Sequence, residues 1–176
     1  MSALSVLYIV LPILAVSLCH ALEVVFTARR WASHHSASSD EAHQSLVNIL
    51  FRLSGMNMSA LVIAAVVGFL AVLLSTTALF AGGLWAELVW TTVFMAYSVC
   101  SLINIVRAVT LKGYVPGLVT SIISVPLIAY AAYSLSLVWP WWEMLLFAIL
   151  GLVLALANLY FAQRLGQRQT SKSTKN

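Results

Sequence analysis

The chain has 176 residues, of which 62% are hydrophobic and 8% are charged, and its formal net charge is +4. A soluble domain carries about 25% charged residues, so this composition excludes an ordinary soluble domain and predicts an all-α, polytopic membrane protein. The small positive charge reflects Lys and Arg near one membrane face and does not indicate nucleic-acid binding.

Five apolar segments are long enough to cross a bilayer, because each offers roughly 20 apolar residues. They cover residues 4–28, 58–80, 84 to about 109, 115–137 and 141–162. Between the first two, residues 41–54 carry apolar side chains at helical spacing and predict a short amphipathic helix along the membrane interface. The sequence thus predicts a single transmembrane helical domain over 1–163 and a basic, disordered cytoplasmic tail over 164–176.

The basic residues predict the orientation of these segments. All nine Lys and Arg residues lie at or beyond the ends of the first, third and fifth segments, and the other two connections have none. Because cytoplasmic loops carry the excess of Lys and Arg, we expect the amino terminus outside and the carboxy terminus in the cytoplasm. Five tryptophans near the opposite ends fit an outer aromatic belt: Trp85, Trp90, Trp139, Trp141 and Trp142. The expected location is the inner (plasma) membrane.

Two ionisable side chains, His20 and Glu23, lie inside the first apolar segment. A charged, unpaired glutamate at membrane depth costs several kcal/mol, so such a residue suggests a functional site. Residues three apart share a helix face, where an imidazole and a carboxylate can share a proton, bind a divalent metal together or pair with a cation. The alternative is a hydrogen-bonded pair that only fixes helix packing.

Three more polar residues fall at a similar predicted depth, counted at 1.5 Å per residue from the basic end of each segment. They are Asn104, Arg107 and Asn158. We therefore expect a polar pocket that opens toward the cytoplasm. If Arg107 pairs with Glu23 there, the glutamate stays ionised at membrane depth. The alternative is that Arg107 extends to the interface and the asparagines bond to backbone.

A second motif precedes the fourth segment and reads Lys112-Gly113-Tyr114-Val115-Pro116-Gly117-Leu118-Val119-Thr120. With the apolar turn around Pro126, it resembles the pattern Arg-x-Tyr-x-Pro-Gly-x-x-Thr … Pro of the HXXEE-domain family of small bacterial membrane proteins. His20-Ala21-Leu22-Glu23 is similar to the naming motif, and the resemblance spans roughly residues 15–135. This chain departs from the family pattern at two positions. It has Val24 where the motif has its second glutamate, and Asn104 where the family has a histidine. If the family binds a metal there, the resemblance implies that this chain keeps half of the ligands.

The second motif also has a physical interpretation. Pro116 suits the first turn of a helix, Gly117 allows close approach of another backbone, and Tyr114 suits the interface, where its hydroxyl stays hydrated. Thr120 lies one turn beyond Pro116 and is expected to face the pocket. The alternative is a well-formed helix start with no further role.

These features support hypotheses from three classes. The first is a membrane-embedded enzyme acting on a lipid or small apolar molecule, with His20 and Glu23 as catalytic residues or metal ligands. Its expected substrate-binding residues are Asn104, Arg107, Tyr114, Thr120 and Asn158. The others are a non-catalytic protein that binds or transports a small molecule or ion, and an accessory subunit of a membrane complex or homo-oligomer. The resemblance implies no reaction, because none is established for the family.

Overall fold

A computed structural model of the chain describes residues 3–35, 58–110 and 112–173. Within them lie five α-helices, each long and apolar enough to cross a membrane. They are α1 Ala3–His35, α3 Met58–Ala81, α4 Leu84–Thr110, α5 Leu118–Ser136 and α6 Trp141–Ser173. The predicted five-helix transmembrane bundle is confirmed, and the predicted amphipathic helix over 41–54 lies outside the described residues.

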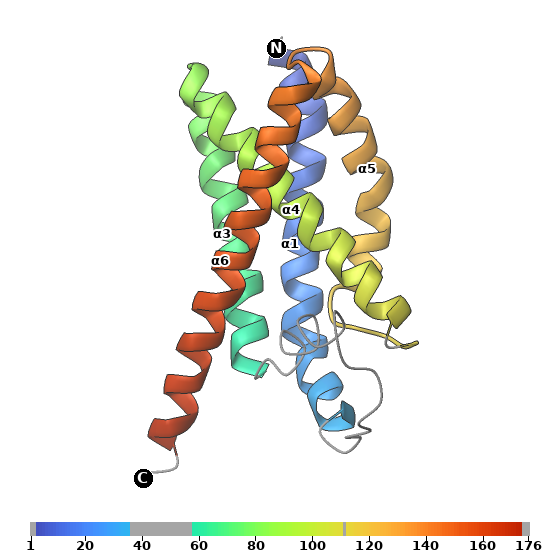
Figure 1. Cartoon of the computed structure of the whole chain (residues 1–176), viewed down its shortest axis with the longest axis vertical. Helices are drawn as coiled ribbons and strands as arrows, with labels where there is room; N and C mark the ends of the chain where they lie inside the picture. Colours follow the sequence, from blue (N-terminus) through green and yellow to red (C-terminus); the bar gives the residue numbers. More distant parts are fainter. Residues whose placement is uncertain (1–2, 36–57, 111, 174–176) are drawn as a thin grey trace.

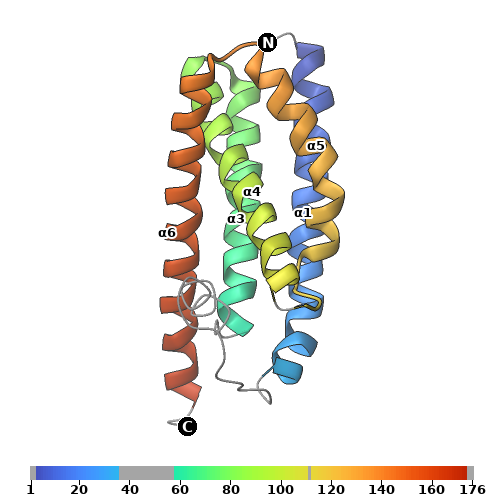
Figure 2. The ribbon, with the colours of Figure 1, turned by 45° about the vertical axis from the view of Figure 1, so that its right-hand side comes forward.

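The five helices close into a ring. α1 packs between α3 and α5, α6 packs between α3 and α4, and α4 also packs against α3 and α5. Figure 1 shows α4 running obliquely across the bundle, and it packs against both α6 and α5. In the turned view of Figure 2, α1 and α5 form one side and α6 the other, with α3 and α4 between them.

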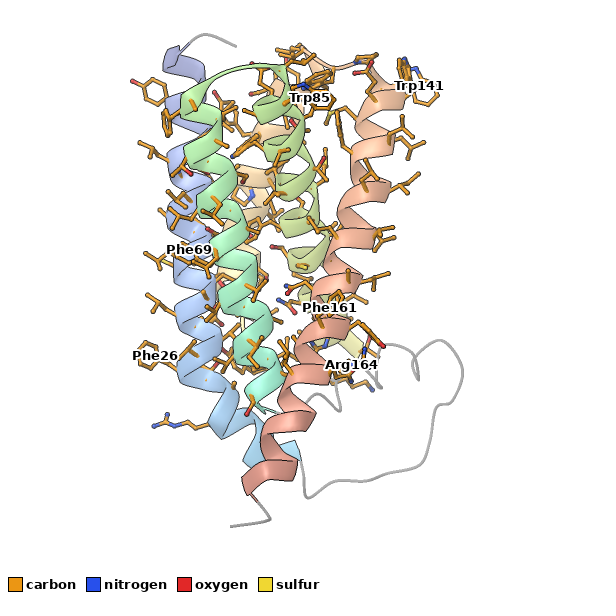
Figure 3. All side chains as sticks on the ribbon, turned by 90° about the vertical axis from the view of Figure 1, so that its left-hand side faces the viewer. Phe26, Phe69, Trp85, Trp141, Phe161 and Arg164 are labelled. Atoms are coloured by element: carbon orange, nitrogen blue, oxygen red, sulfur yellow. The ribbon has the colours of Figure 1, made fainter. Side chains whose placement is uncertain are left out.

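The two ends of the bundle differ in their side chains. The chain termini lie at opposite ends of the long axis (Figure 1). Figure 3 shows Trp85 and Trp141 at the end near the amino terminus and Arg164 in the other half, and these tryptophans are 80% and 78% exposed. Trp90 was expected in the same belt but is buried and stacks on Phe94 at 5.5 Å, because that helix face points into the core.

Two helices extend further than the apolar segments predicted. α1 continues past residue 28 to His35. α6 continues to Ser173, where the sequence predicted a disordered tail. The first tail residues are mostly good helix formers and contain no proline. Gly166 also lies against α3, since a Cβ built there would be 3.1 Å from the Ala60 Cβ, so packing supports this continuation.

The buried core consists of two clusters with different side-chain sizes. One contains large side chains: Ile9, Val10, Ile13, Val72, Trp90, Phe94 and Leu135, with Ala131. The other is built largely from alanines, at positions 60, 64, 108 and 162, with Val24, Leu61 and Val115. Since small side chains fill less of the space between helices, the helices must approach closely or leave a void. Both occur at this cluster: a Cβ at Gly166 of α6 would lie 3.1 Å from the Ala60 backbone nitrogen, and Val24, Leu61 and Ala64 line a cavity.

Candidate functional site

A tight turn places the start of α5. Leu118 N–H donates to the Val115 carbonyl at 3.1 Å, and Gly117 adopts φ 86° and ψ 6°. These angles match the third position of a type II turn, which favours glycine there and proline at the second position. Pro116 and Gly117 occupy those two positions. The sequence predicted Pro116 in the first turn of the helix, but it lies in the β-turn before α5.

Gly117 also lets the imidazole of His20 lie directly against the backbone. A Cβ at position 117 would lie 3.0 Å from His20 Nδ1 and 3.1 Å from Nε2. The close approach expected at this glycine therefore exists, but it involves a side chain of α1. The ring also lies edge-to-face against Tyr97 of α4, with ring centroids 6.1 Å apart.

Glu23 of α1 caps the amino terminus of α5. Gly117 is the N-cap and has no side chain to accept the first amide hydrogens of the helix. The Glu23 carboxylate accepts them instead, from Val119 N–H at 3.1 Å and Thr120 N–H at 2.8 Å. Two hydroxyls complete the set, Tyr114 at 2.7 Å and Thr120 at 2.6 Å. A carboxylate is favoured there because the amino end of a helix carries unpaired N–H groups and partial positive charge.

Tyr114 stays a donor to this carboxylate at neutral pH. Burial, together with the neighbouring Glu23 charge, raises the pKa of the Tyr114 hydroxyl above its ordinary value of 10.0. The phenol thus keeps its proton well into the alkaline range. Tyr114 and Thr120 are both absent from the cavity wall described below, and their contact with a substrate stays a prediction.

A hydrogen-bond relay joins Glu23 to His20 through Thr120. The Thr120 hydroxyl has one proton and two acceptors in reach, Glu23 Oε2 at 2.6 Å and the Gly117 carbonyl at 3.3 Å. The shorter contact to the carboxylate takes the proton. Thr120 Oγ1 must then accept from His20 Nδ1, 2.9 Å away. This fixes the Nδ1–H tautomer of a neutral His20 and leaves Nε2 as an acceptor.

His20 also lines a cavity of about 180 Å³ between α1, α3, α4 and α6. Asn104, Arg107 and Asn158 line the same cavity, as the depth argument predicted, whereas Glu23 does not. Most of the wall is apolar and much of it is Ala and Gly, which explains the open volume. The additional polar or sulfur-bearing side chains on the wall are Ser17, Tyr97 and Cys100. These three were not among the site residues predicted from the sequence, although Ser17 lies one turn before His20 and shares its helix face.

The polar groups of the wall differ in their partners. Asn158 Nδ2 donates to the Ala64 carbonyl at 2.9 Å, and Asn104 Nδ2 makes a long contact of 3.4 Å to the Ser121 hydroxyl. Arg107 is only 8% exposed, yet its Nε and Nη2 have no hydrogen-bond partner among the described residues. The predicted pair between Arg107 and Glu23 is wrong, since the start of α5 supplies the donors that Glu23 accepts.

The described residues do not fit a divalent metal at His20 and Glu23. Among them, no group of three or more His, Cys, Asp or Glu side chains gathers at one point. Each oxygen of Glu23 already accepts two hydrogen bonds, and Nδ1 of His20 bonds to Thr120. Of the ligand atoms of these two side chains, only His20 Nε2 is therefore left without a hydrogen bond among the described residues.

One family model matches residues 11–132 and is described as "Protein of unknown function with HXXEE motif". No curated protein and no solved structure matches the chain. The matched range contains both halves of the Glu23 cap, the motif in α1 and the turn before α5. At the second motif glutamate this chain has Val24, which is buried and lines the cavity.

Proposed function

This chain belongs to the family of proteins of unknown function with an HXXEE motif, and we propose that it binds a small, largely apolar molecule within the membrane. The observation that carries the proposal is the cavity between α1, α3, α4 and α6. Ligand sites are commonly concave and mostly apolar, with a few polar groups that fix the orientation of the ligand. Here those groups are His20, Asn104, Arg107 and Asn158.

Filling the cavity should abolish binding. Gly68 lies on the cavity wall, and a Cβ there meets only Asn158 Nδ2 at 3.8 Å, an ordinary contact. Gly68→Leu should therefore insert its side chain into the cavity without moving backbone. Fluorine NMR of fluorinated octanol should detect a bound population with the natural protein in lipid nanodiscs and none with this variant.

The matched control is Ala78→Leu, which adds similar volume on the same helix at an exposed position outside the cavity wall. It should bind the alcohol as the natural protein does. If neither the natural protein nor the control shows a bound signal, the cavity is not a ligand site. If Gly68→Leu binds as well as the control, the alcohol lies elsewhere.

The relay supports a second function, a membrane-embedded enzyme. A catalytic histidine is oriented by a hydrogen bond to a second group, which is oriented in turn by a third. Here Thr120 holds the His20 ring, and Glu23 holds the Thr120 hydroxyl. His20 Nε2 would remove a proton from a molecule in the cavity, and the Nδ1–H bond to Thr120 would hold the ring in the required tautomer. Glu23 would act as a positioning residue, because it lies behind Thr120 and away from the cavity.

We also propose that the cavity half of the bundle faces the cytoplasm of an inner membrane, with the amino terminus outside. In support, Arg30 and Arg164 lie in the carboxyl-terminal halves of α1 and α6, and Lys112 follows α4. Figure 3 shows Arg164 away from Trp85 and Trp141, and cytoplasmic loops carry the basic excess. A reporter fused after Asn176 should read cytoplasmic, and one inserted at Gly82-Gly83 should read external. The reverse pattern would place the cavity half outside.

A further inference from the structure

We propose that the cavity selects an anion, and that the Arg107 guanidinium holds the carboxylate or phosphate head of a single-chain amphiphile. This inference rests on the proposed function, because it requires that the cavity holds a molecule. It adds the charge of that molecule and the group that recognises it.

The first support is that the Arg107 charge has no acidic neighbour among the described residues of the cavity wall. The side chain is 8% exposed and lines the cavity, and none of the residues that line the cavity is Asp or Glu. A buried cation without a partner is expensive, and such groups in membrane proteins normally face a partner or a ligand. An anion bound in the cavity would supply the missing opposite charge.

The second support is the identity of the unpartnered atoms. Nε and Nη2 lie on one edge of the planar guanidinium, and both are buried without a partner among the described residues. The side chain must therefore turn toward the cavity to present this edge to a ligand. Two parallel N–H groups on one edge match the two oxygens of a carboxylate or phosphate. Asn104 lies one helical turn before Arg107, and both it and Asn158 line the cavity. The remaining wall, largely apolar, suits a short hydrocarbon chain.

The third support comes from position 24. Val24 and Arg107 line the same cavity, and Val24 stands where the family motif has its second glutamate. A glutamate there would bring a carboxylate into the cavity that holds Arg107. With valine at this position, the guanidinium remains available for an anion that enters from outside the protein.

The test compares three probes of equal chain length in nanodiscs of zwitterionic lipid: octanoate, octyl phosphate and octanol. A charge-assisted bidentate contact is worth about 1.5–3 kcal/mol, so at least one anion should bind about tenfold or more tightly than the alcohol. The tighter of the two anions then identifies the head group as carboxylate or phosphate. Gly68→Leu should abolish binding of both anions, which would locate them in the cavity.

Three variants test whether the Arg107 guanidinium is the group that gives the preference for the anion. Arg107→Gln should remove the preference for the anion while octanol still binds. Val24→Glu should also remove it, because the new carboxylate competes for Arg107, and this variant leaves the arginine in place if Arg107→Gln fails to fold. Arg164→Gln removes the same charge at an exposed site outside the cavity and should keep the preference.

The outcomes separate the two proposals. Equal binding of octanol and both anions to the natural protein would overturn the anion inference and leave the proposed function intact. An anion preference that survives in both Arg107→Gln and Val24→Glu would also overturn it, because another group would then supply the charge. No binding of any probe would overturn both.

Discussion

Replacing Glu23 by alanine should lower the free energy of unfolding by about 2–4 kcal/mol, because the change leaves four donors without their acceptor. The donors are the Val119 and Thr120 amides and the Tyr114 and Thr120 hydroxyls. Glu23→Gln should cost less, since one oxygen remains as an acceptor. Thermal unfolding in detergent measures the difference. Amide hydrogen exchange should rise first at Val119 and Thr120.

The control is Glu143→Ala, which removes a carboxylate from the first turn of its own helix, α6. At that position the carboxylate stabilises the helix only through its interaction with the helix dipole, so its removal should cost about 0.3–1 kcal/mol. Equal losses in the two variants would show that Glu23 does not cap α5. Nitrogen NMR of the His20 ring adds a second measurement: Nδ1 should be protonated in the natural protein, and Glu23→Ala should release this preference, because Thr120 then loses its acceptor.

Gly117→Ala should be the second severe change, with an expected loss of about 3 kcal/mol or more. An L-residue in the left-handed region costs roughly 1–2 kcal/mol, and the new Cβ would overlap the His20 ring, which lies 3.0 Å away at Nδ1. Gly82→Ala is the matched control, because Gly82 has φ 82° but nothing within 4 Å of its added Cβ. The difference between the two melting temperatures isolates the contact with His20.

A double variant checks the cause of that difference. His20→Ala removes the ring, so Gly117→Ala should cost only the backbone term in that background. Strictly additive losses would mean that the glycine is required by the turn alone and that the His20 ring does not depend on it.

The membrane fold could be predicted from the sequence because apolar length and charge distribution determine it directly. The helix ends could not, since apolar length marks the span and not the polar turns that continue a helix, as in α6 after residue 163. The location of Trp90 also could not be predicted from apolar length alone. Its position near the end of a span is visible in the sequence, but the face of α4 that it occupies depends on how that helix crosses the bundle.

The candidate site was predicted in part for a related reason. Counting residues gives the depth of each side chain and places His20, Asn104, Arg107 and Asn158 at a similar level, and all four line the cavity. Depth does not give direction around the helix axis. Glu23 therefore seemed equally available to Arg107, whereas it faces α5 and meets backbone donors that no side-chain pattern reveals.

The cap on α5 also bears on the order in which the bundle can assemble. Glu23 and the Thr120 amide that it accepts are separated by 97 positions in the chain. During synthesis, α1, α3 and α4 precede α5, so the carboxylate is made long before its donors exist. Until residues 114–120 are added, Glu23 has none of the four donors that it accepts in the folded protein, and the step that joins α5 to α1 satisfies this charge. Formation of this pair thus marks the joining of α5 to α1, and the ring is complete only when α6, which follows in the chain, packs between α3 and α4.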